Sequence, residues 1–126
     1  MEEGKVILLV DDDLTLREMY EERLRSEGFE IIQATNGEEA MQKAQESHPN
    51  VILLDIMMPK VNGFDVLKQL KADSELKNIP VIILTALIQD VDKEQGKSLG
   101  AADYIVKSET MPGEVIVKIK NVIDHK

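Results

Sequence analysis

The sequence contains no cysteine and no tryptophan, and aromatic residues make up only 3% of it. The absence of cysteine excludes disulfide bonds, thiolate metal sites and cysteine nucleophiles. The two histidines, His48 and His125, lie near predicted helix ends and leave little for a histidine-based metal site or catalytic triad. With so few aromatic residues, we expect no platform for stacking nucleic-acid bases.

Positive charge is also scarce. The 15 Lys and Arg residues are outnumbered by 24 Asp and Glu residues, and the formal net charge is −9. Sequence-independent DNA binding needs Lys and Arg that displace phosphate counterions, so we expect no direct contact with nucleic acid. No apolar run approaches the roughly 20 residues that span a bilayer, and the acidic start shows no signal-peptide pattern. We therefore expect a cytoplasmic protein without membrane insertion.

Short apolar runs alternate with amphipathic segments along the 126 residues. The runs are typical of strands and cover 6–10, 29–34, 51–54, 79–84 and 104–106. Apolar residues spaced by three and four predict helices over 16–24, 64–70 and 115–123 and between Asn36 and Pro49. Residues 89–99 predict a weaker helix, because they include few apolar residues and an internal Gly96. Five strands alternating with five helices predict an α/β fold, a parallel sheet doubly wound by helices.

Polar residues gather where the predicted strands end. They are Asp11, Asp12 and Asp13 after the first strand, Asp55 after the third, Thr85 after the fourth and Lys107 after the fifth. In open parallel sheets the ligand crevice lies outside the carboxyl ends of the strands. The order of the strands cannot be read from the sequence, but if the first and third are neighbours, three carboxylates converge there.

Such a cluster needs positive charge. Two like charges about 4 Å apart repel by about 4 kcal/mol at an effective dielectric of about 20, and Lys107 offsets only one of the three charges of Asp11, Asp12 and Asp55. A divalent cation would balance the remainder, and oxygen ligands favour Mg²⁺, or Mn²⁺, over Zn²⁺. Mg²⁺ also prefers phosphate oxygens, which predicts a site for a phosphoryl group beside Lys107 and the Thr85 hydroxyl.

Each of these residues also has a plain structural explanation. Asp13 is predicted to cap the following helix, a position that favours aspartate. Taken singly, Asp55, Thr85 and Lys107 are consistent with a loop acid, a strand-end hydroxyl and a solvated lysine. Compatible groups at four strand ends at once favour a site, in which an aspartate can itself act as the nucleophile and form an acyl phosphate.

Four segments resemble the signature segments of the response-regulator receiver domain, the CheY-like family. They are VILLVDDD, VILLDIMMPKVNG, VIILTA and GAADYIVK. The resemblance extends from about Lys5 to Ile123 and implies a flavodoxin-like fold, with residues 1–126 as a single receiver domain. It also implies that Asp55 accepts a phosphoryl group from a histidine kinase or a phosphotransfer protein.

The resemblance implies a metal site as well. Asp12 and Asp55 would bind Mg²⁺ directly, together with the backbone carbonyl of Met57. Asp11 would take part through a water molecule.

The resemblance further implies a conformational switch. Lys107 would pair with the phosphoryl group, Thr85 would move toward it, and Tyr104 would swing inward as the threonine moves. An ordinary half-buried strand tyrosine is the alternative explanation for Tyr104. A downstream protein target would bind the face formed by the fourth helix, the fifth strand and the last helix, and a monomer is favoured. Candidate residues on that face are Lys93, Lys97, Tyr104 and Lys118.

The sequence departs from the family's pattern in two places. Ser108 stands where the family usually has a proline after a cis peptide bond. Because a cis bond without proline costs about 3–4 kcal/mol, we predict a trans bond there and an altered loop through Pro112. Met57 and Leu87 flank the phosphoryl group in the family, and apolar side chains cannot orient an attacking water. We expect slow self-dephosphorylation, hence a phosphoacceptor rather than a turnover enzyme.

Two other functions remain open. The segment from Asp11 to Thr15 fits the D-x-D-x-T pattern of haloacid-dehalogenase-like phosphatases, in which Asp11 would be the nucleophile and Asp13 the general acid. That family generally has a longer chain and a further acidic motif, and it leaves the segment from Asp55 to Gly63 unexplained. The third possibility is an interaction module with a receiver-like fold that is never phosphorylated.

Overall fold

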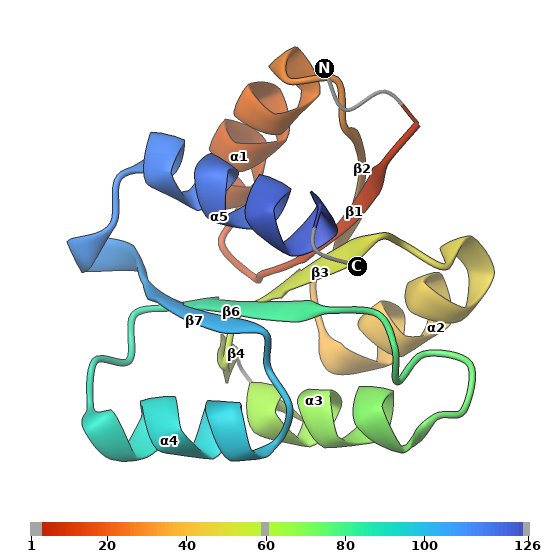
Figure 1. The fold of residues 1–126 in the computed structure, drawn as a ribbon, viewed down its shortest axis with the longest axis vertical. Helices are drawn as coiled ribbons and strands as arrows, with labels where there is room; N and C mark the ends of the chain where they lie inside the picture. The colour runs from red at the N-terminus through yellow and green to blue at the C-terminus, as the bar shows by residue number, and fades with distance from the viewer. Residues whose placement is uncertain (1–3, 59–60, 125–126) are drawn as a thin grey trace.

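A five-stranded parallel sheet forms the centre of the computed structural model, which describes residues 4–58 and 61–124 (Figure 1). Its strand order is β2-β1-β3-β6-β7. The strands are β1 (Val6–Val10), β2 (Glu30–Ala34), β3 (Val51–Leu54), β6 (Val81–Thr85) and β7 (Asp103–Val106). The helices are α1 (Leu14–Ser26), α2 (Gly37–Ser47), α3 (Gly63–Ala72), α4 (Asp90–Ser98) and α5 (Pro112–Asp124). Strands and helices alternate as predicted, which confirms the doubly wound α/β fold.

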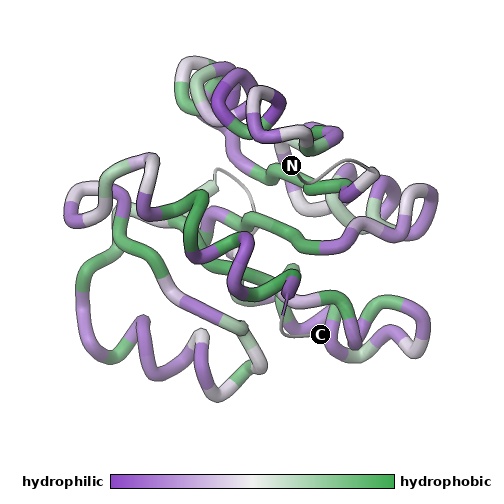
Figure 2. Tube along the Cα trace, turned by 45° about the horizontal axis from the view of Figure 1, so that its top comes forward, coloured by the Kyte–Doolittle hydropathy of each residue, from purple (hydrophilic) through white to green (hydrophobic). Residues whose placement is uncertain are grey.

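Helices cover both faces of the sheet. Figure 1 shows α1 and α5 on one face and α2, α3 and α4 on the other. Successive side chains of a strand point to opposite faces, so Ile7 and Leu9 pack in the cluster that includes α1 and α5, whereas Leu8 and Val10 pack in the cluster on the other face. Burial on both faces explains why β1, β3 and β6 read as continuous apolar runs, and Figure 2 shows these hydrophobic segments inside partly hydrophilic helices.

Two strands begin later than the sequence predicts. β6 begins at Val81 rather than at residue 79, because Pro80 has no N–H to donate to a neighbouring strand. The Pro80 carbonyl does accept a hydrogen bond from the Ile52 N–H at 3.0 Å. β2 begins at Glu30, because the Phe29 N–H donates back to the Leu24 carbonyl near the end of α1.

The segment after β3 holds a short hairpin, which is not among the strands that the apolar runs predict. Strands β4 (Met57–Met58) and β5 (Val61–Asn62) pair antiparallel, and residues Pro59 and Lys60 between them, like His125, lie outside the described residues. The Asn62 side chain then caps α3 by accepting a hydrogen bond from the Phe64 N–H at 2.8 Å. The hairpin thus connects the end of β3 directly to α3.

Two weaker expectations concern α4 and the loop after β7. α4 does form, at Asp90–Ser98, although Gly96 is its only buried residue. The described residues contain no cis peptide bond, so the bond before Ser108 is trans as predicted, and residues Lys107–Glu109 form a short 3-10 helix, η1. Within the described part of the chain, no helix has the length and apolar character needed to cross a membrane.

Substituting Gly63 with alanine tests how the hairpin is held. A Cβ atom at Gly63 would lie 2.5 Å from both the Asp55 carbonyl oxygen and the Ile56 Cα, and backbone atoms cannot turn aside as a flexible side chain can. We expect Gly63→Ala to lower the free energy of unfolding by about 1–3 kcal/mol, as overpacking does. Urea unfolding followed by circular dichroism measures this change.

Gly113 provides the matched control. It lies in α5, and nothing comes within 4 Å of a Cβ atom placed there. Gly113→Ala should leave stability unchanged or raise it by up to about 1 kcal/mol through helix propensity. A Gly63→Ala variant as stable as the native chain would contradict the close backbone contact.

Candidate functional site

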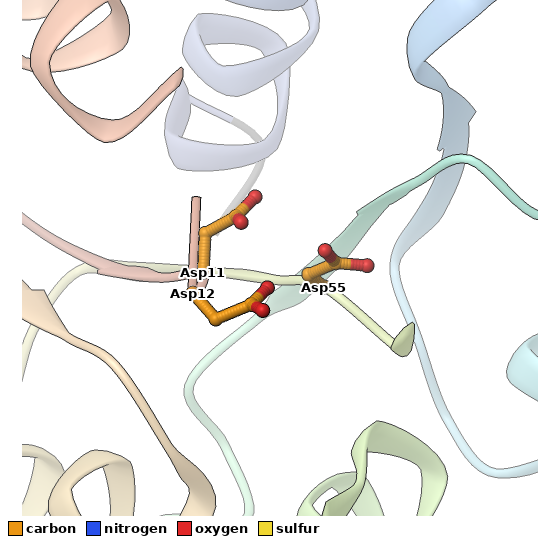
Figure 3. Close-up of side chains that lie close together, drawn as sticks. All are labelled: Asp11, Asp12 and Asp55. Atoms are coloured by element: carbon orange, nitrogen blue, oxygen red, sulfur yellow. The ribbon is translucent and has the colours of Figure 1, made fainter. Parts of the chain in front are cut away.

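Three carboxylates meet at the carboxyl ends of two neighbouring strands. Asp11 and Asp12 follow β1, and Asp55 follows β3, whose residue Leu54 pairs with Val10. One oxygen atom from each of the three carboxylates lies within 4.8 Å of the others, and Figure 3 shows the three side chains together at these strand ends. Because β1 and β3 are neighbours in the sheet, the three carboxylates lie together, as the sequence predicts for that strand order.

Backbone hydrogen bonds hold the two buried carboxylates in place. Asp55 is 4% exposed, and its Oδ1 atom accepts a hydrogen bond from the Met57 N–H at 2.9 Å. Asp11 is 1% exposed, and its Oδ1 atom accepts one from the Asp13 N–H at 2.9 Å. Asp12 is exposed and faces solvent at the rim of the cluster. Two fixed carboxylates beside one exposed carboxylate form a donor set of oxygen atoms that suits a hard divalent cation.

Lys107 lies at the start of η1, directly after β7, and reaches the two buried carboxylates. Its Nζ atom is 2.9 Å from Asp11 Oδ2 and 3.1 Å from Asp55 Oδ2. The formal charges of Asp11, Asp12, Asp55 and Lys107 sum to −2, so the described residues of the cluster do not balance it. A divalent cation would do so.

The pKa shifts of the central ion pair reflect burial and charge together. Burial raises the pKa of Asp11 above its ordinary value of 3.8, even though the Asp13 N–H and the Lys107 ammonium both lower it. Burial also lowers the pKa of Lys107, but the hydrogen bond to Asp11 and the negative charges of Asp55 and Asp11 outweigh burial and raise it overall. The contacts of the pair therefore favour the charged form of Lys107, whereas burial disfavours the charged form of Asp11.

Thr85 and Tyr104 are connected through one residue, Leu87. The fully buried Thr85 ends β6, and its Oγ1 atom accepts a hydrogen bond from the Leu87 N–H at 3.4 Å. Tyr104 is a half-buried residue of β7, and its hydroxyl donates to the Leu87 carbonyl at 3.0 Å. Burial, followed by the charges of Asp92 and Asp55, raises the pKa of Tyr104 to about 12. The two residues predicted to form a switch therefore share a contact that the sequence did not reveal.

Met57, two residues after Asp55, lines one pocket together with Leu87. The same pocket is lined by Ile56, Met58, Asn62, Phe64, Asp92 and Gln95. Met57 is one of the exposed large apolar residues, and 53% of its surface is accessible to solvent. The two apolar residues predicted to flank the phosphoryl group therefore line one common pocket, and their position beside that group stays a prediction.

Arg17 also supports the site, although no motif of the sequence singles it out. Its side chain is 8% exposed, and its Nη1 atom donates a hydrogen bond to the Asp11 carbonyl at 2.8 Å, while its Nε atom donates to Gln33 at 3.0 Å. Arg17 lies three and seven residues before Tyr20 and Leu24, on the buried side of α1. That spacing was the available signal, because an arginine on the apolar side of a helix needs a polar partner.

Asp13 has the structural role that its position predicts. It caps α1, and its Oδ1 atom accepts a hydrogen bond from the Leu16 N–H at 3.1 Å. Its carboxylate is not part of the cluster formed by Asp11, Asp12 and Asp55. This arrangement does not favour the phosphatase alternative, in which Asp13 would be the general acid beside Asp11.

The chain is similar to known receiver proteins over nearly its whole length. Residues 7–120 match the family model of the response regulator receiver domain. The chain is 42% identical over 119 residues to the probable transcriptional regulator ycf27 of Cyanophora paradoxa, covering 94% of this chain and 48% of that protein. It is 43% identical over 117 residues to the transcriptional regulatory protein CpxR homolog of Haemophilus influenzae, covering 93% and 49%. The chain thus spans about half the length of these relatives.

A solved structure agrees with the sequence relatives. Chemotaxis protein CheY4 of Vibrio cholerae is 32% identical and aligns with a TM-score of 0.87, covering 94% of this chain and 98% of that one. At this level of identity and coverage the likeness extends to the whole described fold.

Replacing Lys107 with methionine tests the charge arrangement. The variant keeps much of the side-chain volume but leaves the buried carboxylates of Asp11 and Asp55 without an ammonium. We expect the free energy of unfolding to fall by about 1–3 kcal/mol at pH 7 without divalent cations. Urea unfolding in the presence of a chelator measures the loss.

The stability lost in Lys107→Met should grow with pH. The pKa of Asp11 is higher in the folded chain than in the unfolded chain, so protonation of Asp11 stabilises the fold. This stabilisation is complete below the pKa of the unfolded chain, near 3.8, and is lost as the pH rises through the pKa of the folded chain. Lys107→Met should raise the pKa of Asp11 in the folded chain further, so the variant's loss of unfolding free energy should grow above about pH 4. Lys118→Met is the control, because it breaks a half-exposed pair with Asp103 worth less than about 1 kcal/mol. Equal losses in both variants at pH 7 would argue against the account.

Proposed function

The chain belongs to the response regulator receiver family, and on this premise we propose that Asp55 accepts a phosphoryl group in a Mg²⁺-dependent reaction. One observation carries the proposal: the Asp11, Asp12 and Asp55 carboxylates lie together, and a single ammonium contacts two of them. We further propose that residues 1–126 act as one receiver domain in the cytoplasm, favoured as a monomer.

In the proposed transfer, an Asp55 carboxylate oxygen attacks the phosphorus of a phosphohistidine on a histidine kinase or a phosphotransfer protein. The new oxygen–phosphorus bond forms while the nitrogen–phosphorus bond breaks, and the imidazole leaves with that electron pair. Lys107, already 3.1 Å from Asp55, would stabilise the phosphoryl oxygens. Asp12, Asp55 and the Met57 carbonyl would hold Mg²⁺, with Asp11 taking part through water, and the cation would supply the remaining positive charge.

The added negative charge would then bias the Thr85–Tyr104 pair. Thr85 ends β6, the strand that pairs with β3, and its hydroxyl would turn from the Leu87 N–H toward a phosphoryl oxygen. Such a local charge change can shift a two-state population that a partner protein senses. The two relatives named above are transcriptional regulators, which supports an output in transcription that we propose this domain exerts through a protein target.

The proposal predicts a single phosphoryl adduct on Asp55. After incubation with acetyl phosphate and Mg²⁺, intact-mass spectrometry should show one adduct on the native chain and none on Asp55→Asn or in the presence of a chelator. Asp13→Asn is the matched control, because asparagine caps a helix as well as aspartate does and Asp13 is outside the cluster. Its adduct should equal that of the native chain.

Other outcomes would point to other functions. An adduct that survives in Asp55→Asn would move the nucleophile elsewhere, with Asp11 the next residue to test. No adduct from acetyl phosphate or from a phosphorylated kinase would favour an interaction module that is never phosphorylated. Slow decay of the adduct after removal of the donor is also expected, because the Met57 and Leu87 side chains in the adjoining pocket cannot orient an attacking water.

A further inference from the structure

Helix α4 packs against β7 with little of its surface buried. Among its residues only Gly96 is buried, and its N-cap residue Gln89 makes no side-chain hydrogen bond to the first turn. The residues beneath Gly96 are Ile83 of β6 and Tyr104 of β7, which are paired neighbours in the sheet. The backbone of α4 at Gly96 therefore covers the tyrosine that contacts Leu87.

A side chain at residue 96 would not fit this arrangement. A Cβ atom there would lie 2.6 Å from Ile83 Cδ1 and 3.2 Å from Tyr104 Cδ2. Ile83 is fully buried in the core, so its side chain has little room to turn. Tyr104 is half-buried and Gly96 is the only buried residue of α4, so the ring and the helix can shift more easily than Ile83 can. Both movements would uncover the Tyr104 ring.

The Tyr104 ring also lies between two functional regions. On one side its hydroxyl reaches Leu87, whose N–H contacts the Thr85 hydroxyl. On the other side the ring lines a second pocket with Lys93 and Lys97 of α4. The position of the ring therefore joins the end of β6 to the outer face of α4 and β7.

We propose that Gly96 is a positioning residue: its missing side chain lets α4 lie close enough to Ile83 and Tyr104 to hold the tyrosine ring against the Leu87 carbonyl. This inference rests on the proposed function for its role in signalling, but its geometry stands alone. Gly96 thus links the phosphoryl site to the face that a target protein would bind.

Tyrosine fluorescence provides a direct test. The chain has two tyrosines and no tryptophan, so in a Tyr20→Phe background Tyr104 is the only fluorescent reporter. Acrylamide quenching then measures the exposure of the Tyr104 ring without any phosphodonor. We expect Gly96→Ala to raise the quenching constant severalfold, whereas Gly113→Ala, with open space around its Cβ, should leave it unchanged.

A rescue variant separates this role from general damage to the fold. Ile83→Val removes Cδ1, the atom nearest to the new Cβ, so the double variant Ile83→Val/Gly96→Ala should give a quenching constant between those of the native chain and Gly96→Ala. Unchanged quenching in Gly96→Ala, or a rise that Ile83→Val does not reduce, would overturn the proposal. If Gly96→Ala does not fold, the double variant Ile83→Val/Gly96→Ala is compared with Ile83→Val alone. Equal quenching constants in these two variants would overturn the proposal.

The phosphorylation assay keeps the two proposals distinguishable. The mass of each native and variant sample is measured after treatment with acetyl phosphate and Mg²⁺. Absence of an adduct on the native chain, with acetyl phosphate and with a phosphorylated kinase, would reject the proposed function, while the quenching result would still decide the role of Gly96. An adduct on the native chain together with unchanged quenching in Gly96→Ala would support the proposed function and reject the role of Gly96.

Discussion

The Lys107 ammonium is the contact on which the site depends. The ammonium lies 2.9 Å from Asp11 and 3.1 Å from Asp55, and these two contacts connect the start of η1 to the ends of β1 and β3. Without it, two almost fully buried carboxylates would face each other, and like charges about 4 Å apart repel by about 4 kcal/mol at an effective dielectric of about 20. Even with it, the cluster keeps a formal charge of −2 once Asp12 is counted. The fold therefore holds a charge imbalance in a rigid frame.

The rest of the molecule divides into a rigid part and a loosely attached part. The central strands are buried on both faces, and Arg17 fixes the Asp11 backbone from the buried side of α1. In contrast, α4 is held at Gly96 and lies over Tyr104. Elements with few buried contacts move at low cost, whereas a packed core does not. A change of charge at the rigid site would therefore be expressed at α4.

The sequence predicts the fold well because strands buried on both faces are unbroken apolar runs. It also predicts the site residues at strand ends, because the carboxyl ends of parallel strands share one edge. It could not predict that β1 and β3 are neighbours, since no local pattern encodes strand order. Arg17 was overlooked because it occupies an apolar face by making hydrogen bonds, and Gly96 was interpreted only as a helix-weakening residue. Its close contact with Ile83 and Tyr104 depends on tertiary packing.

A Mg²⁺ titration of stability tests the central claim most directly. If the carboxylate cluster binds the cation, Mg²⁺ at 100 times its dissociation constant should raise the free energy of unfolding of the native chain by about 2.7 kcal/mol. Asp13→Asn should respond equally, because Asp13 caps α1 outside the cluster, while Asp12→Asn should lose most of the response. No response in the native chain, or an undiminished response in Asp12→Asn, would contradict the account.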